Sequence, residues 1–361
     1  MAKKPDEPLR KGWTTGACAT AASAAAFTAL VTGRFPDPVT ITLPRGEEPS
    51  FALARAELDG KTATASVIKD AGDDPDITHG AEIVATVRRG AAGSGVTFAA
   101  GPGVGMVTKP GLPIPAGQPA INPRPREMMA SAIAQIAARH GVAGDVAITI
   151  GVTDGAALAK KTWNPRLGIV GGLSILGTTG VVIPYSCSAW IHSIHRGIDV
   201  ARATGMTHVA GATGRTSERT VQKLYSLDDG AMLDMGDFAG GMLKYLRRHP
   251  IPRVTIGGGF GKLVKLAQGE MDLHSSRSQV DHDVLAGLAR DAGADDALVA
   301  AVSAATSAGE ALGLAQAADV PLADVVAARA REAALAVLSG GVTLDVVVID
   351  RAGVIVGRAG P

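Results

Sequence analysis

The sequence predicts a protein of the α/β plus α+β class, with an N-terminal α+β domain followed by a Rossmann-like domain built on a mostly parallel sheet. The chain has 361 residues, of which 46% are hydrophobic, and a globular chain of that length usually forms about two domains. Short strand-like runs between Gly, Pro and Asp turns fill residues 38–99. From residue 143, short apolar runs that end in glycine alternate with helix-like stretches, the pattern of a parallel sheet with crossover helices. We therefore expect an α+β domain over 1–142 and a Rossmann-like domain over 143–361.

The first regular element expected is a helix over residues 16–32. This stretch is rich in alanine, the best helix former, and Gly33 can end it. Thr14 or Thr15 can cap its first turn. The free N–H groups of a helix start could also hold a carboxylate or a phosphate, but an ordinary N-cap is the more frequent explanation of such threonines.

An acidic loop is expected between the third and fourth strands, in the stretch KDAGDDPD over residues 69–76. Its four aspartates could bind a divalent cation, hold ribose hydroxyls or form Asx-turns. Their spacing lacks the alternation of oxygen ligands found in an EF-hand. No resident metal site is therefore predicted in this loop.

A long glycine- and proline-rich stretch over residues 101–125 precedes a helix expected to begin near Arg126. Loops of this length inside compact proteins are often functional. Arginine suits planar carboxylates, so Arg126 is a candidate for anion binding. Ordinary surface charge at a helix start is the explanation that composition alone favours.

Glycines of the second half lie at the ends of the apolar runs and are densest in Asn164–Ser186. If the runs are parallel strands, these glycines lie at the carboxyl ends, where open α/β sheets bind ligands. Glycine allows the close approach of either a ligand or a neighbouring element, and both interpretations stay open. The run GGGFGK, which begins at Gly257, matches neither the dinucleotide-binding motif nor the P-loop motif.

The remaining candidates are weaker. His192 and His195 could share a helix face, but no third metal ligand is evident in the sequence. The alanine-rich tail over residues 281–340 is expected to be helical and to be followed by a β-hairpin. We see no catalytic signal in this tail.

The bulk composition limits the partners and the compartment. The formal net charge is +1, which gives no general attraction to nucleic acid and no polybasic face for a membrane. Two cysteines, Cys18 and Cys187, are too few for a disulfide framework and fit a reducing compartment. The N-terminus is polar, with no apolar signal segment behind it, so a cytoplasmic protein is expected.

Five stretches in the same order resemble those of one family, the cobalt-precorrin-5B (C1)-methyltransferases of the anaerobic-type cobalamin pathway. They are GWTTGACATAA (12–22), KDAGDDPDITHGA (69–81), the glycine–proline stretch over 101–129, NPRLGIVGGLSILGTTGVVIPYS (164–186) and GKLVKLAQG (261–269) with His274 and Ser275. The sequence departs from the family pattern before the Gly261-Lys262 pair, where a histidine is often found, and at Asp237, where asparagine is common.

The resemblance implies an enzyme that transfers a methyl group from S-adenosyl-L-methionine to C1 of cobalt-precorrin-5B, giving cobalt-precorrin-6A. It implies that cobalt is present only within the substrate. The expected partner is a corrin precursor; neighbouring pathway enzymes and a homo-oligomer are left open, and neither nucleic acid nor membrane is expected. Two alternatives remain. One is a non-catalytic carrier of a corrin intermediate. The other is a nucleotide-dependent oxidoreductase, and the failed GxGxxG match disfavours this second alternative.

Three sets of residues are predicted to form the site. Aspartates assigned to proton transfer or to the ribose and ammonium groups of the donor are Asp70, Asp73 and Asp74. Residues assigned to S-adenosylmethionine, which needs close backbone contact, are Gly168, Gly171, Gly172, Gly177, Thr178, Thr179, Gly180, Gly257, Gly258 and Gly259. Residues assigned to the carboxylates of the precursor are Thr14, Thr15, Lys69, Asn122, Arg126 and Arg166. The loops 69–76 and 168–180 are expected to be in contact.

Overall fold

The chain forms two compact units, Met1–Ser186 and Cys187–Pro361. The structure, a computed structural model, describes residues 8–338 and 340–361. The boundary between the units lies after Ser186, whereas the sequence pattern placed it after residue 142. The reason is that Val146–Val152, expected to open the parallel sheet, instead pairs inside the sheet of the first unit.

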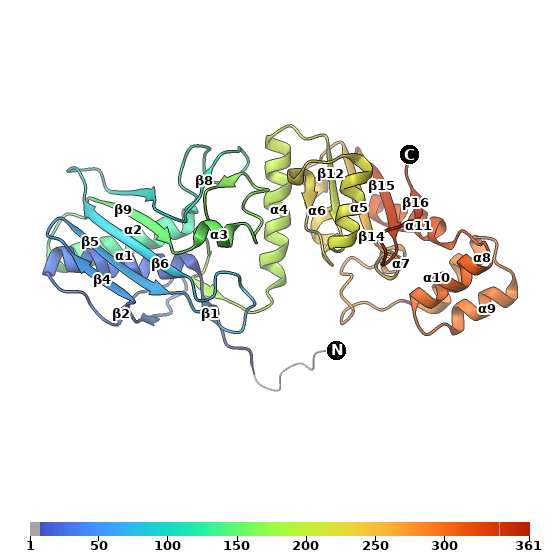
Figure 1. Cartoon of the computed structure of the whole chain (residues 1–361), viewed down its shortest axis with the longest axis horizontal. Helices are drawn as coiled ribbons and strands as arrows, with labels where there is room; N and C mark the ends of the chain where they lie inside the picture. The colour runs from blue at the N-terminus through green and yellow to red at the C-terminus, as the bar shows by residue number, and fades with distance from the viewer. Residues whose placement is uncertain (1–7, 339) are drawn as a thin grey trace. The chain divides into compact units, whose positions relative to one another are not determined.

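The first unit is built on a five-stranded sheet in the order β4-β5-β6-β9-β7 (Figure 1). Its strands are β4 (Arg55–Leu58), β5 (Thr62–Ile68), β6 (Glu82–Arg89), β7 (Val96–Ala100) and β9 (Val146–Val152). Neighbouring strands are antiparallel except β7 and β9, which are parallel. This unit is therefore the α+β part that the sequence predicted, although its sheet also includes β9, which was expected in the second domain.

Helix α1 (Thr15–Thr32) lies at the centre of the first unit, where it packs against β5, β6 and α2 (Pro123–His140). The predicted helix over 16–32 is thus confirmed, with Thr14 as N-cap and Gly33 in the left-handed conformation at the C-terminus. Its many alanines let the sheet and α2 approach closely. Among the described helices, α1 alone is long and apolar enough to cross a membrane, and 78% of it is buried in the protein, as in a core helix.

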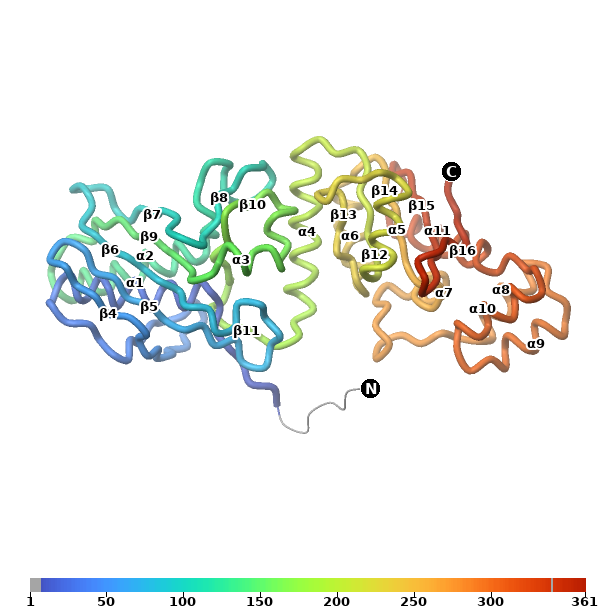
Figure 2. The backbone as a smooth tube through the Cα atoms, in the orientation of Figure 1, coloured from blue at the N-terminus to red at the C-terminus, as the bar shows by residue number. Residues whose placement is uncertain are grey.

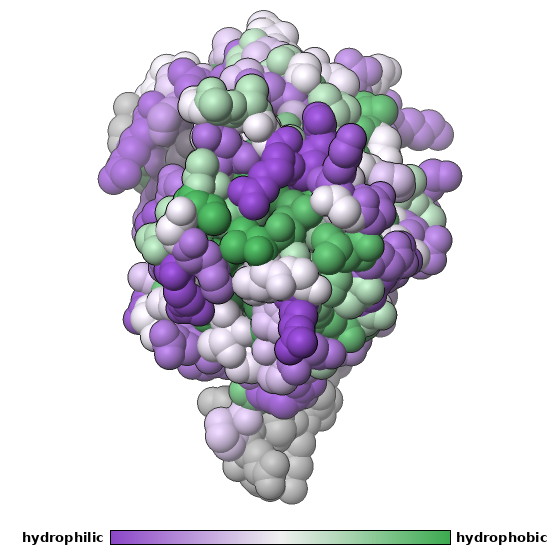
Figure 3. Space-filling model, turned by 90° about the vertical axis from the view of Figure 1, so that its left-hand side faces the viewer, coloured by the Kyte–Doolittle hydropathy of each residue, from purple (hydrophilic) through white to green (hydrophobic). Residues whose placement is uncertain are grey.

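Short two-stranded sheets and irregular loops complete the first unit. The pairs are β1 (Gly12–Trp13) with β11 (Val181–Val182), β2 (Val39–Thr40) with β3 (Ser50–Phe51), and β8 (Met106–Val107) with β10 (Ile169–Val170); α3 spans Gly155–Ala159. Figure 2 shows the loops that carry β8, β10 and β11 gathered at one end of the unit. Figure 3 shows the opposite end, where an apolar area is ringed by hydrophilic side chains.

The second unit has a mostly parallel sheet in the order β13-β12-β14-β15-β16. Its strands are β12 (His208–Ala212), β13 (Met232–Leu233), β14 (Arg253–Gly259), β15 (Thr343–Ile349) and β16 (Ile355–Ala359), of which only β16 is antiparallel to its neighbour. The predicted C-terminal hairpin is confirmed as β15 and β16. The described chain is thus a mixed α/β protein.

Helices alternate with the strands of the second unit and then form its tail. They are α4 (Cys187–Ala203), α5 (Arg215–Tyr225), the 3₁₀ turn η1 (Asp229–Ala231), α6 (Ala239–Arg248), α7 (Phe260–Ala267), α8 (His282–Asp291), α9 (Asp296–Ala304), α10 (Ala308–Ala317) and α11 (Leu322–Leu338). The helical tail expected from residue 281 is confirmed. A single buried core joins it to the sheet, because α11 packs against α7, β15 and β16.

Candidate functional site

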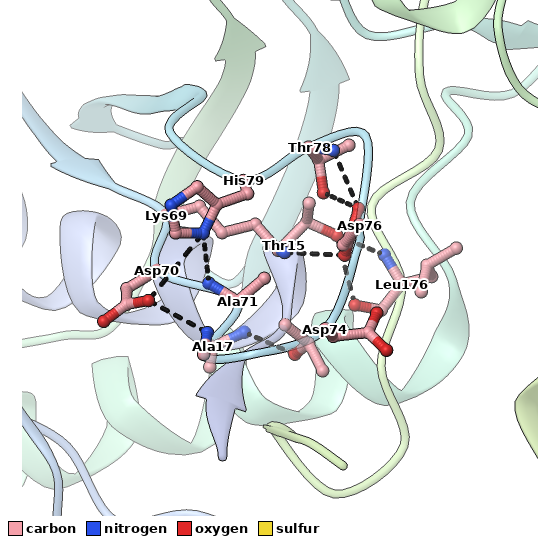
Figure 4. A network of polar contacts seen from close by, with 12 residues as sticks. Thr15, Ala17, Lys69, Asp70, Ala71, Asp74, Asp76, Thr78, His79 and Leu176 are labelled. Carbon is pink, nitrogen blue, oxygen red and sulfur yellow. Dashed lines mark hydrogen bonds and ion pairs between the residues drawn. The ribbon is translucent and has the colours of Figure 1, made fainter. Parts of the chain in front are cut away.

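The start of α1 lies between the acidic loop and the glycine-rich segment (Figure 4). The N–H of Trp13 donates to the Asp70 carbonyl at 2.7 Å, and the N–H of Thr14 donates to the Gly180 carbonyl at 2.9 Å. Successive N–H groups of an extended chain point to opposite sides, so the two loops flank residues 12–14. A direct bond also links them, since the N–H of Tyr185 donates to Asp74 Oδ1 at 2.8 Å. This bond lies just beyond the 168–180 range in which contact with the acidic loop was expected.

Arg10 holds two of the aspartates assigned to catalysis. The guanidinium of Arg10 forms a bidentate ion pair with Asp70. The backbone N–H of Arg10 donates to Asp73 Oδ2 at 2.6 Å. The hydrogen bond from Arg10, helped by that from the N–H of Gly72, lowers the pKa of Asp70 to about 2. Asp70 is therefore ionised at neutral pH and is a weak base, suited to fixing the loop.

Lys69 is buried and does not face solvent. Its ammonium donates to Asp76 Oδ2 at 2.7 Å, and Asp76 Oδ1 accepts from the N–H and the hydroxyl of Thr78. Burial alone would raise the pKa of Asp76, but the charge and hydrogen bond of Lys69 and the bonds from Thr78 lower it. The structure thus argues against Lys69 as a substrate ligand and gives Asp76, absent from the predicted site, the role of its partner.

The threonines at the start of α1 serve the fold. Thr14 Oγ1 accepts from the N–H of Ala17 at 3.1 Å, as an N-cap. Thr15 Oγ1 exchanges hydrogen bonds with the backbone of Leu176, at 3.0 and 3.2 Å, and both threonines are buried. The ordinary N-cap was the more frequent explanation, and it is the one observed. The structure argues against Thr14 and Thr15 as substrate ligands.

Arg126 and Asn122 hold the chain that leads into α2. The guanidinium of Arg126 donates to the carbonyls of Ile121 and Pro119 at 2.8 and 3.1 Å, and burial lowers its pKa. The side-chain amide of Asn122 donates to the Ile175 carbonyl at 3.1 Å. These bonds indicate that both residues stabilise the chain before α2. Both were predicted to bind the carboxylates of the precursor, and the structure argues against that role.

Arg166, another predicted substrate residue, is half-buried. Its guanidinium carbon lies 4.4 Å from the centre of the Trp163 ring. Stacking on an aromatic face orders the planar guanidinium, whose fork geometry matches a carboxylate. Arg166 therefore remains a candidate for binding a carboxylate.

Most glycines of the 164–186 segment are explained by packing. A Cβ on Gly172 would lie 2.2 Å from the Gly103 carbonyl oxygen, and one on Gly177 would lie 2.3 Å from Thr14 Oγ1. Gly168 and Gly180 similarly lie against side chains of Lys109 and Leu43. Thr179 Oγ1 accepts from the N–H of Val181 in a local turn, whereas Thr178 is exposed. Gly171, with φ of 89° and open space around it, can still approach a ligand.

The carboxyl edge of the sheet in the second unit is the other candidate region. From β12 the chain moves outward to β13, whereas from β14 it moves to β15 on the other side. This reversal is a topological switch point, where open α/β sheets bind ligands. The edge is formed by Thr213 and Gly214 after β12 and by Gly259 at the end of β14.

The glycines at this edge differ in their surroundings. A Cβ on Gly257 or Gly258 would meet the side chains of Val221 or Thr213, whereas one on Gly259 would have its nearest neighbour at 4.0 Å. Gly259 is therefore the most open of the three predicted donor-binding residues. The sequence pattern could not place Thr213 beside Gly259, because strand order is a tertiary property.

An ion pair lies after β13. Lys262 Nζ donates to Asp237 Oδ1 at 2.5 Å and to the Leu273 carbonyl at 2.9 Å. Asp237 is one of the two positions at which the sequence departs from the family pattern. Its carboxylate and Lys262 together fasten the segment after α7 to the end of β13.

Of the two histidines of α4, His195 is packed, whereas His192 is exposed. His195 stacks on Tyr245 with ring centres 3.9 Å apart, and its Nε2 lies 3.2 Å from the Gly241 carbonyl. Within residues 8–338 and 340–361, no group of three or more His, Cys, Asp or Glu side chains could hold a metal ion. The acidic loop is accounted for by its contacts with Arg10, Lys69 and Tyr185.

Known proteins resemble this chain over nearly its whole length. Residues 2–184 match the family model described as CbiD, and residues 272–360 match that described as CbiD, C-terminal domain. A "Cobalt-precorrin-5B C(1)-methyltransferase" of Paramagnetospirillum magneticum is 62% identical, with 98% of this chain and 99% of the relative covered. One of Brucella anthropi, with the same name, is 60% identical over 97% of this chain and 95% of its own. A crystal structure of a cobalamin biosynthesis protein (cbiD) from Archaeoglobus fulgidus is 27% identical, covering 74% of this chain and 83% of that one, with a TM-score of 0.40.

Proposed function

The chain belongs to the CbiD family, and from this premise we propose that it methylates C1 of cobalt-precorrin-5B, giving cobalt-precorrin-6A in cobalamin biosynthesis, with S-adenosyl-L-methionine as the methyl donor. The observation that carries the proposal is the near full-length identity with relatives named for this reaction. The cobalt belongs to the substrate. The residues of the chain then have to bind two small molecules, align them and exclude water.

We place the donor at the carboxyl edge of the second sheet, in a Rossmann-like arrangement. The open backbone of Gly259, with Thr213 and Gly214 beside it, supports this choice. The helices that follow, α5 and α7, begin at this edge, and their first N–H groups favour a carboxylate such as that of the methionine part. Gly257 and Gly258 then shape the edge by packing, and Gly171 is the residue of the 168–180 loop that could still contact a ligand.

We place the corrin precursor on the first unit, at the loops that flank the start of α1. Arg166 is the candidate for an acetate or propionate group, since guanidinium and carboxylate pair in a plane. The acidic loop would repel such groups directly, so Asp70, Asp73 and Asp74 are proposed to support the site and not to grip the substrate. Alignment of a methyl donor with a ring carbon can supply roughly 7–11 kcal/mol of the barrier, which suits a site without a strong acid or base.

The rival proposal is a carrier that binds a corrin intermediate without chemistry. Calorimetry with S-adenosylhomocysteine separates the two, because only an enzyme needs a donor site. We expect binding in the micromolar to millimolar range, together with a mass gain of one methyl group on cobalt-precorrin-5B incubated with the donor. Absence of both would favour the carrier.

We also propose a cytoplasmic location for this reaction. The unpaired Cys18 is buried within α1, and burial raises the pKa of its thiol to about 12. Such a thiol is unreactive, and unpaired cysteines fit a reducing compartment. Fractionation of cells that make the protein would test the location.

A further inference from the structure

Tyr185 has an unusual backbone conformation. Its φ is 55°, in the left-handed region. Other described non-glycine residues with positive φ are Asp154, Ser226 and Asp319, each a small polar residue that flanks a helix, Asp154 before α3 and the other two after α5 and α10. A bulky residue in this region is strained and persists only where its surroundings impose the conformation. Such strain often accompanies a functional position, so the surroundings of Tyr185 are informative.

The acidic loop holds Tyr185 in place. The bond of 2.8 Å from the Tyr185 N–H to Asp74 Oδ1 fixes its backbone. The loop that carries Asp74 is itself anchored by the buried Lys69–Asp76 pair and by the bond from the Arg10 N–H to Asp73. The loop thus gives Asp74 a rigid support, and Asp74 gives Tyr185 a fixed position.

The side chain of Tyr185 is exposed, as are several other large apolar side chains of the 164–186 segment. Tyr185 is 67% exposed, and Val170, Leu176 and Ile183 on the same segment are 58%, 52% and 54% exposed. Ile77, directly after the acidic loop, is 41% exposed. Tyr185 is the most exposed of these side chains, and its backbone is the one held by Asp74.

We propose that Tyr185 contacts the substrate, with its ring against the apolar face of the cobalt corrin, and that Asp74 is a positioning residue that holds Tyr185 for this contact. This inference rests on the proposed function. A corrin is a broad ring with apolar faces and carboxylates at its rim, so a rigid aromatic side chain matches the face. Arg166, on the same segment, matches the rim.

Positioning by Asp74 and proton transfer by Asp74 require different chemical groups. A positioning residue needs only an oxygen that accepts the Tyr185 N–H, and the amide oxygen of asparagine can do the same. A general base needs the carboxylate itself. Asp74→Asn should therefore retain function in the first case and lose it in the second.

The first experiment removes the ring. Tyr185→Asn keeps a residue type that accepts the left-handed conformation. We expect the KM for cobalt-precorrin-5B to rise roughly tenfold, and the affinity for cobyrinic acid, a stable cobalt corrin with free carboxylates, to fall by a similar factor in calorimetry. The affinity for S-adenosylhomocysteine should stay the same. The control is Val284→Asn, which removes an apolar side chain that is 44% exposed on α8; it should change neither affinity.

The second experiment tests the support. Asp74→Ala should raise the KM for the precursor as Tyr185→Asn does. Asp74→Asn should instead keep the KM close to the wild-type value. Full loss of turnover in Asp74→Asn, or unchanged cobyrinic acid affinity in Tyr185→Asn, would overturn the inference. A wild-type protein that binds cobyrinic acid through Tyr185 but transfers no methyl group would support this inference and overturn the proposed function.

Discussion

The ammonium nitrogen of Lys69 lies 2.7 Å from a carboxylate oxygen of Asp76, and 1% of the lysine side chain is exposed. A cation this deeply buried must be paired, because removal from water is costly for an isolated charge. Here the pair fixes the far end of the loop whose other aspartates meet Arg10 and Tyr185. The Lys69–Asp76 pair therefore anchors the acidic loop, and through this loop it supports the candidate site.

Breaking this pair should destabilise the first unit. Asp76→Ala leaves the Lys69 ammonium buried without its partner, and we expect a loss of about 3 kcal/mol in the free energy of unfolding. Lys69→Met in the same background removes the buried charge and should restore part of that loss. Urea unfolding of the two single variants and the double variant measures the coupling; additive effects would contradict the pairing.

The Arg10–Asp70 pair should make stability depend on pH in the acid range. The pKa of Asp70 is lowered from 3.8 to about 2 in the folded protein, so the unfolded chain binds the proton more readily. The stability that the pair contributes is therefore present above pH 3.8 and is lost as the pH falls towards about 2. Near neutral pH, Asp70→Asn should have a lower free energy of unfolding than the wild type. This difference in the free energy of unfolding should shrink on acidification. A difference that grows on acidification would refute this assignment.

The glycines of the 164–186 segment should differ sharply in their tolerance of a methyl group. Gly172→Ala places a Cβ against the Gly103 backbone, and we expect a loss of about 3 kcal/mol in the free energy of unfolding. A Cβ on Gly171 would meet no neighbouring atom, and only the positive φ of this residue disfavours alanine. We therefore expect Gly171→Ala to lower the free energy of unfolding by about 1 kcal/mol. Thermal unfolding of the two variants side by side tests the packing explanation, which equal effects would undermine.

A side chain at Gly259 should obstruct the donor. Its φ of −65° suits any residue and its surroundings leave room for a Cβ, so Gly259→Val is expected to fold. We expect a fall of roughly tenfold or more in the affinity for S-adenosylhomocysteine, because the valine side chain would occupy the open space beside Gly259 in which the donor is placed. Gly287→Ala on α8, also in open space, is the matched control. Unchanged affinity in Gly259→Val would move the donor away from this edge.

Local sequence signals predicted the elements that depend on local chemistry. Alanine content and the Thr14 and Gly33 caps placed α1 to within one residue of its observed start. The hairpin of β15 and β16 followed from two apolar runs around a turn. In each case the residues that determine the element are neighbours in the chain.

The predictions that differ from the structure depend on partners distant in sequence. The apolar run of β9 is compatible with either sheet, and only its pairing with β6 decides which one. Gly172 was assigned to a ligand because its contact with Gly103 is invisible in the sequence. Lys69 was assigned to the substrate because no pattern reveals that its charge is buried with Asp76.

The strand β1 has a consequence for the order of folding. It joins the start of α1 to the acidic loop and to β11, and the Thr15–Leu176 contact spans 161 residues of chain. Contacts between such distant segments form late, because loop closure must precede them. During synthesis, the surface around Tyr185 therefore comes into being only when the whole first unit has left the ribosome. A stalled or truncated chain would lack this surface while its N-terminal helix could already be packed.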